Sequence, residues 1–90
     1  SVKTTFQNSI INGNNTGVLV NTGELGMTNC QISGNVVGVQ AGNGGTIRMS
    51  NNSVIGNNTG LAGTSLISFG INLVKGNNIN GSFTSTDPLN

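Results

Sequence analysis

The sequence has no histidine, tryptophan or tyrosine, and it contains only one cysteine and one proline. Charged residues make up 6% of the chain, whereas about a quarter is typical of soluble domains. The absence of histidine removes the commonest side chain for acid–base chemistry and metal binding. The single cysteine, Cys30, excludes an internal disulfide, and without a nearby base it lacks the activation that a nucleophile needs.

The few charged residues are scattered along the chain and sum to a net charge of +1: Lys3, Glu24, Arg48, Lys75 and Asp87. Three isolated cations do not form the basic face that binds phosphate backbones, so we expect no nucleic-acid partner. No apolar run approaches the roughly 18 residues of a membrane-spanning helix, so we expect no membrane partner either.

What the sequence does contain is a repeat built on the dipeptide Gly-Asn. The dipeptide begins at Gly13, Gly34, Gly56 and Gly76, with spacings of 21, 22 and 20 residues. In three copies another glycine stands four residues after the first, and an aliphatic residue follows it. A fixed period of about 20 residues is typical of solenoid proteins, in which each repeat is one structural unit.

Within each repeat the apolar residues alternate with polar ones, which is the pattern of a strand with one buried face. No segment has helical periodicity over the length that a helix needs. The sequence therefore predicts an all-β fold, a right-handed parallel β-helix (β-solenoid) of about four coils with roughly 21 residues per coil. We expect three short strands per coil and a single domain over residues 1–90, with coils over about 6–83 and a C-terminal tail over 84–90.

Equivalent side chains of successive coils stack into ladders along the axis of a solenoid. The predicted interior ladders are Ile11/Ile32/Val54/Val74, Val18/Val39/Leu61/Phe83, Leu25/Ile47/Ile67 and Phe6/Met27/Met49/Phe69. A ladder of asparagines is expected at one turn, because stacked amides bond along a column and asparagine tolerates left-handed backbone. Its members are Asn14, Asn35, Asn57 and Asn77. A second inward polar column is expected at another corner: Ser9, Cys30, Asn52 and Asn72.

A search for chemistry finds no catalytic site. Hydrolysis of polysaccharides needs two carboxylates across one bond, yet Glu24 is expected in a turn and Asp87 in the tail. Arg48 is read as an outward, solvated side chain, and Cys30 as a buried one. Met27 and Met49 are read as a hydrophobic ladder in preference to a copper site. The stretch AGNGGT (41–46) is read as a loop between coils. We therefore expect a protein that is not an enzyme and that has no metal site and no cofactor.

Units such as NCQISGNVVGVQ (29–40) and NNSVIGNNTGL (51–61) resemble the β-helix repeats of the pectate-lyase-like superfamily. That superfamily holds lyases, hydrolases, epimerases and adhesins, so the resemblance implies a fold more than an activity. The last residues look like the C-terminal coils of a bacterial β-helix protein, and the resemblance favours a secreted or cell-surface location. It also implies polysaccharide as an alternative partner.

The two ends of the repeat differ. At the C-terminus, Asp87 and Pro88 are expected to stop further strand pairing, since proline offers no donor. At the N-terminus no cap is visible, and Phe6 and Ile11 are expected to form an uncovered apolar floor. Either the chain is the C-terminal piece of a longer β-helix, or a second copy covers this floor end to end, giving a homo-oligomer.

The sequence thus favours a non-enzymatic structural or surface-interaction module that self-associates through its N-terminal end. The alternative is a carbohydrate-binding or polysaccharide-active β-helix protein, or a fragment of one.

Overall fold

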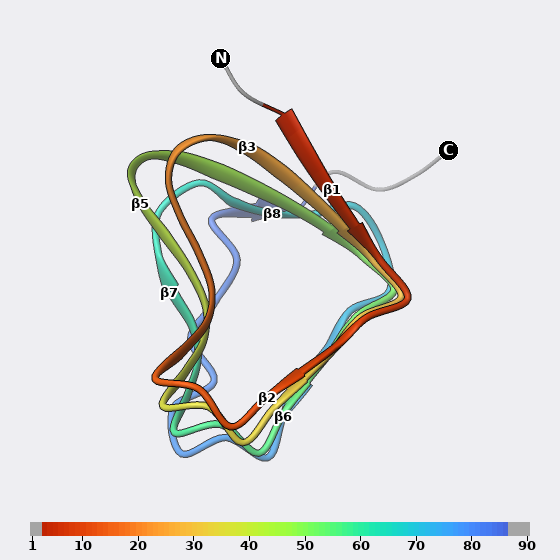
Figure 1. Ribbon diagram of the computed structural model, residues 1–90, viewed down its shortest axis with the longest axis vertical. Coiled ribbons are helices and arrows are strands. Elements are labelled where there is room, and N and C mark those ends of the chain that lie inside the picture. Colours follow the sequence, from red (N-terminus) through yellow and green to blue (C-terminus); the bar gives the residue numbers. More distant parts are fainter. Residues whose placement is uncertain (1–2, 87–90) are drawn as a thin grey trace.

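The computed structural model describes residues 3–86, which form an all-β solenoid of about four coils with a triangular cross-section (Figure 1). This confirms the predicted fold class. The strands are β1 Lys3–Gln7, β2 Ile10–Asn12, β3 Thr16–Thr28, β4 Gln31–Ser33, β5 Val37–Ser50, β6 Ser53–Ile55, β7 Thr59–Gly63, β8 Leu66–Ser68, β9 Leu73–Lys75 and β10 Ser85–Thr86. Residues 3–86 include no helix of a length and hydrophobicity that would cross a membrane.

All strand pairs are parallel, as expected when each coil lies on the one before it. One sheet has the order β1-β3-β5-β8-β10, with β7 also paired to β5, and the other has the order β2-β4-β6-β9. Because each coil returns to the same three sides, residues about 21 positions apart in the sequence are neighbours in space.

Two coils differ from the expected three short strands. β3 and β5 each run through a corner of the triangle as one bent strand of 13 and 14 residues. The stretch 41–46 is therefore part of β5, and its prediction as a loop was wrong. A register shift between Val20 and Thr22 marks the bend. At this corner a Cβ on Gly45 would lie 2.0 Å from the Val20 carbonyl oxygen, so β5 crosses here only because Gly45 has no side chain.

The two glycines of the repeat have different physical roles. The first one adopts a left-handed backbone, with φ between +66° and +76° in all four copies, a conformation that costs glycine little. The second one lies under the amide of the asparagine ladder. A Cβ on Gly38 would be 2.8 Å from the Gly60 carbonyl oxygen and 3.1 Å from Asn57 Nδ2. The Gly-Asn-x-x-Gly pattern is therefore the sequence of one corner of the solenoid.

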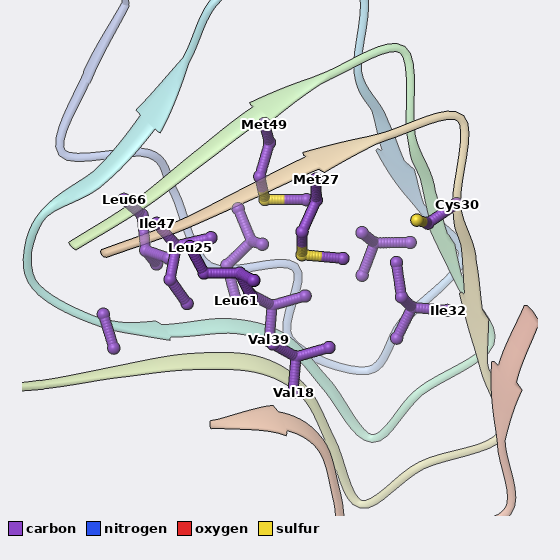
Figure 2. Close-up of a cluster of buried hydrophobic side chains, with 12 residues drawn as sticks. Val18, Leu25, Met27, Cys30, Ile32, Val39, Ile47, Met49, Leu61 and Leu66 are labelled. Atoms are coloured by element: carbon purple, nitrogen blue, oxygen red, sulfur yellow. The ribbon is translucent and has the colours of Figure 1, made fainter. Parts of the chain in front are cut away.

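The interior is a narrow stack of aliphatic and methionine side chains (Figure 2). Strand register joins Ile11 to Ile32, Ile32 to Val54 and Val54 to Val74. It also joins Val18 to Val39 to Leu61, Leu25 to Ile47, and Phe6 to Met27 to Met49. Phe83 is half-buried and packs against this core. The stack is most completely buried in the middle coils, where Ile32, Val39 and Ile47 have no exposed surface.

In the third coil two predicted ladder positions were wrong. Leu66 lies on Ile47 and Ser68 lies on Met49, whereas Ile67 and Phe69 were expected there. Ile67 pairs with the outward-facing Arg48.

The physical reason is a shorter corner. From Ala41 to Ile47 the second coil takes six residue steps, whereas the third coil takes three from the paired residue Gly63 to Leu66. The left-handed residues Gly63 and Ser65 permit this tight turn. Part of the deficit is recovered before Asn72, where the exposed Ile71 bulges from the coil. The Gly-Asn spacing therefore stays near 20 and conceals the shift.

Candidate functional site

The charged side chains of the middle coils form one surface ion pair. Arg48 extends from the outer face of β5 and contacts the carboxylate of Glu24 on β3. Glu24 pairs in register with Thr46, so its predicted place in a turn was wrong. The two side chains are 38% and 31% exposed respectively. Asp87, the other carboxylate of the sequence, lies outside the described residues.

The sulfur-containing side chains are buried. The Cys30 side chain is directed at the carbonyl oxygens of Thr28 and Phe6, with Sγ–O distances of 3.5 and 3.8 Å, and Cys30 is 1% exposed. Met27 and Met49 stack on each other inside the solenoid (Figure 2). Residues 3–86 contain no group of three or more His, Cys, Asp or Glu side chains close enough to hold a metal ion.

The asparagine ladder is the most regular polar feature of the structure. Asn14, Asn35 and Asn57 each donate their backbone N–H to the side-chain Oδ1 of the asparagine in the next coil, at 2.9, 3.0 and 2.7 Å. Their side-chain Nδ2 groups donate to the same oxygen atoms. In the middle coils Nδ2 also donates backward, for example from Asn57 to the Ile32 carbonyl oxygen at 3.1 Å. Each amide therefore ties three coils together.

A second column repeats this pattern at the corner after β1, β3 and β5. Cys30 donates its backbone N–H to Asn52 Oδ1 at 2.9 Å, and Asn52 donates to Asn72 Oδ1 at 3.0 Å. Asn52 Nδ2 also bonds to the Met27 carbonyl oxygen at 3.0 Å. No buried side-chain nitrogen or oxygen among the described residues lacks a hydrogen-bond partner. Because buried amides are costly only when unpaired, the two columns stabilise a core that has few apolar residues.

The chain itself covers two of the three sides at the C-terminal end of the solenoid, whereas β9 is the last described strand of its sheet. Asn77, the last member of the ladder, donates its backbone N–H and its Nδ2 to Oδ1 of Asn80, at 3.3 and 2.9 Å. The backbone of Ile79 and Asn80 accepts hydrogen bonds from the β7 side of the third coil. β10 pairs with β8 on another side of the triangle. This role of Asn80 was not predicted from the sequence. The one indication in the sequence is an additional asparagine three residues after Asn77.

The N-terminal end is open over the described residues. β1 and β2 are each the first strand of a sheet, with no described strand on their outer edges. The segment 16–20 of β3 likewise has no described coil on its outer edge. A hollow of about 440 Å³ opens here, lined by Thr4, Phe6, Val18, Val20 and Leu25 among others. Phe6 is 37% exposed, although it is in register with the buried Met27. This open end is the candidate functional site.

The charges at the open end are few. Lys3 on β1 is the one ionisable side chain among residues 3–20, and Glu24 on β3 lines the hollow. The half-buried Ile11 and Val20 and the exposed Phe6 make this end a largely apolar floor. It is framed by three strand edges that have no partner among residues 3–86. Such an arrangement can bind another β-strand coil by backbone hydrogen bonds and apolar contact. No family model, curated protein or solved structure matches this chain.

Proposed function

We propose that this chain is a non-enzymatic structural or surface-interaction β-solenoid module that self-associates through its N-terminal end. The observation that supports the proposal is the difference between the two ends. At the last coil, Asn80 and β10 occupy two of the three places where a further coil would bind. At the first coil, the edges of β1, β2 and residues 16–20 are left without a described partner.

Exposed strand edges bind other strands unless they are shortened, charged, broken by proline or covered. The open edges carry one charge, Lys3, and no proline. Association with another coil would satisfy their backbone groups and cover Phe6 and Ile11. The hydrophobic effect favours covering this floor, at about 25 cal/mol for each Å² of apolar surface removed from water.

The non-enzymatic part of the proposal rests on the described side chains. Glu24 is the one carboxylate among residues 3–86, and it is engaged by Arg48. Hydrolysis of a glycosidic bond uses two carboxylates on opposite sides of the bond. The side chains that line the open end are mostly threonine, valine, leucine and phenylalanine, together with Asn21 and Glu24. This lining supplies one carboxylate, which does not provide the pair that glycoside hydrolysis uses.

The proposal is tested by light scattering over a hundredfold range of protein concentration. We expect the mean mass to rise toward twice the monomer mass as the concentration rises. Thr5→Pro should abolish this rise, because Thr5 lies in the edge strand β1 and proline removes its N–H donor. Thr5→Val keeps that donor and should associate like the parent. A parent chain with a constant monomer mass at every concentration would contradict the proposal.

We further propose that these coils belong to the right-handed β-helices of the pectate-lyase-like superfamily. The parallel stacking of four coils and the repeat length support this assignment, as does the resemblance of the units 29–40 and 51–61. A secreted or cell-surface location would follow from it. A crystal structure in which the chain winds with the opposite hand would contradict the assignment.

Polysaccharide binding is a second candidate function, favoured by a shallow hollow on the outer face of β1, β3 and β5. The hollow measures about 420 Å³, and its lining includes Lys3, Glu24, Arg48 and the ring of Phe69. Sugar sites commonly combine polar groups with an aromatic surface. Phe69 is half-buried. It was predicted in a core ladder, but Ser68 takes that place on Met49, and Phe69 lines this outer hollow instead.

Affinity electrophoresis in gels that contain alginate or dextran tests this second candidate. The two polymers separate binding of an acidic polysaccharide from binding of a neutral one. Phe69→Ala should remove any retardation, whereas Leu73→Ala, an exposed change on β9, should leave it unaltered. Unretarded migration of the parent in both gels would count against the candidate.

A further inference from the structure

We infer that two copies associate N-terminus to N-terminus about a two-fold axis through Thr5, so that β1 of one copy pairs antiparallel with β1 of the other. This inference rests on the proposed self-association and specifies its geometry. The alternative is head-to-tail stacking, in which the last coil of one copy lies on the first coil of the next and filaments can grow.

The two covered sides of the C-terminal end disfavour head-to-tail stacking. A following coil would need the N–H and Nδ2 donors of Asn77, which already bond to Asn80. It would also need the outer edge of the third coil, where Gly60 and Leu61 donate to the carbonyl oxygens of Ile79 and Asn80 at 2.7 and 3.0 Å. The remaining side, β9, is the last described strand of its sheet and carries Lys75, as β1 carries Lys3, so the difference between the two ends rests on the other two sides.

The backbone of β1 is suited to pairing with itself. In β5, the inward residue Ile47 directs its N–H to the following coil, toward the Ser65 carbonyl oxygen at 3.0 Å. Thr4 occupies the equivalent position in β1, through its register with Leu25. Because the direction of backbone groups alternates along a strand, Thr5 directs its N–H and C=O to the free edge.

A two-fold axis at Thr5 makes the two Thr5 residues a hydrogen-bonded antiparallel pair, in which each donates to the other. The same axis places Lys3 opposite Gln7 of the second copy, because these residues flank Thr5 symmetrically in β1. Like charges directly opposite each other destabilise a strand pair, and this register separates the two lysines. Both neighbouring pairs are then a cation with a neutral amide.

The triangular cross-section allows the other two sides to pair in the same event (Figure 1). The corner at residues 13–15 lies opposite the side formed by β1. A two-fold axis through Thr5 and this corner exchanges the two remaining sides, so that β2 lies on residues 16–20 of the second copy and runs antiparallel to them. The two Asn14 residues meet at the corner. No described residue donates a hydrogen bond to Asn14 Oδ1, which is therefore available to the second copy.

The size of the face predicts a weak dimer. A triangle within the two longer extents of the molecule, 29 and 27 Å, has an area of about 390 Å². Two such faces bury on the order of 800 Å² in total, below the roughly 1,200 Å² of most stable specific interfaces. We therefore expect a dimer that forms reversibly with rising concentration and that stops at two copies.

Pairs of engineered cysteines test the geometry in the full chain, with oxidised glutathione as the oxidant. Thr5→Cys alone should give a disulfide-linked dimer, since hydrogen-bonded antiparallel pairs have Cα atoms about 5.5 Å apart. A mixture of Lys3→Cys and Gln7→Cys should cross-link more than either variant alone. The parent chain is the control for Cys30, which is buried and should not react.

A mixture of Thr5→Cys with Ser82→Cys, a change on the exposed C-terminal segment, tests the alternative. A dominant Thr5–Ser82 cross-link, or masses above two copies, would overturn the N-to-N geometry while leaving self-association in place. A monomer at all concentrations would overturn both. Thermal melts of each reduced variant should match the parent, and Thr5→Ser, which restores a hydroxyl without a thiol, should dimerise without cross-linking.

Discussion

Asn77 donates two hydrogen bonds to a single oxygen atom of Asn80, from its backbone N–H at 3.3 Å and from its side-chain Nδ2 at 2.9 Å. Asn57, one coil earlier, donates the same pair of bonds to Oδ1 of Asn77. Asn80 therefore takes the acceptor position that the ladder asparagine of a further coil would occupy, although it follows Asn77 by only three residues. The last hydrogen bonds of the amide column are thus of the same kind as those that join its coils.

Asn80→Ala should loosen the last coil. The substitution removes the acceptor of both Asn77 donors, and because these groups are exposed to water we expect a loss of about 1 kcal/mol in the free energy of unfolding. Urea denaturation measures this loss, and faster hydrogen exchange at the Asn77 amide would locate it. Asn78→Ala is the matched control, since the Asn78 amide bonds only at the surface, to Asn58. Equal losses for both variants would contradict a capping role.

Asn57→Ala should be far more damaging than Asn14→Ala, although both residues belong to one ladder. Asn57 is 3% exposed, and its removal takes hydrogen bonds from the Asn35 backbone N–H and the Ile32 carbonyl oxygen, and one of two from Asn35 Nδ2. Buried groups left unpaired cost about 1–3 kcal/mol each, so we expect a loss of roughly 3 kcal/mol or more. Asn14 is exposed and should cost about 1 kcal/mol or less. The two free energies of unfolding, compared under one set of conditions, decide the matter.

Gly38→Ala should destabilise the fold, whereas Gly26→Ala should not. A Cβ on Gly38 meets the Gly60 carbonyl oxygen at 2.8 Å, and a Cβ on Gly26 meets no atom within 4 Å. We expect a loss of about 2 kcal/mol or more for the first variant. The second should be neutral or slightly stabilising, by up to about 1 kcal/mol, because alanine restricts the unfolded chain. Thermal melts measure both variants, and equal melting temperatures would contradict the close contact between Gly38 and the Gly60 carbonyl oxygen.

The shifted ladder of the third coil predicts unequal effects at adjacent positions. Leu66 has no exposed surface, so Leu66→Ala should cost about 2–5 kcal/mol. Ile67 pairs with Arg48 on the outer side, so Ile67→Ala should cost about 1 kcal/mol or less. Chemical denaturation of the two variants measures both values. A larger loss for Ile67→Ala than for Leu66→Ala would contradict this register and favour Ile67 as the ladder residue.

The ion pair of Glu24 and Arg48 should contribute little to stability. Both side chains are about one-third exposed, and exposed pairs typically contribute about 0–1 kcal/mol. A double-mutant cycle with Glu24→Gln and Arg48→Gln measures the coupling, which should shrink further in high salt. A coupling well above 1 kcal/mol that persists in salt would require a more buried arrangement.

The ladders show how far a sequence of this kind can be interpreted without a structure. Where the repeat length is constant, counting from Gly34 to Gly56 also aligns Ile32 with Val54 and Met27 with Met49. In the third coil a corner that is three residues shorter is offset in part by a bulge of one residue, so the Gly-Asn spacing falls only from 22 to 20. Alternation alone then fits Ile67 and Leu66 equally well, and only packing against Ile47 selects Leu66.

The ends were predictable in part. The uncovered floor at Phe6 follows from strand alternation, and the structure leaves that residue 37% exposed. The closure by Asn80 depends on a loop conformation, which no periodic pattern encodes. The contact between Glu24 and Arg48 crosses two coils diagonally, and its signal, two opposite charges on outward positions of adjacent rungs, becomes visible only once the register is known.

The amide columns also make the length of the molecule adjustable. Asn35 presents to Asn14 the same oxygen atom, at nearly the same distance, that Asn57 presents to Asn35. A unit such as residues 34–55 therefore leaves behind, when excised, two surfaces that already match, and it can be duplicated for the same reason. Unequal crossing-over within the gene of such a protein would yield solenoids with fewer or more coils, in which each coil is still hydrogen-bonded to the next.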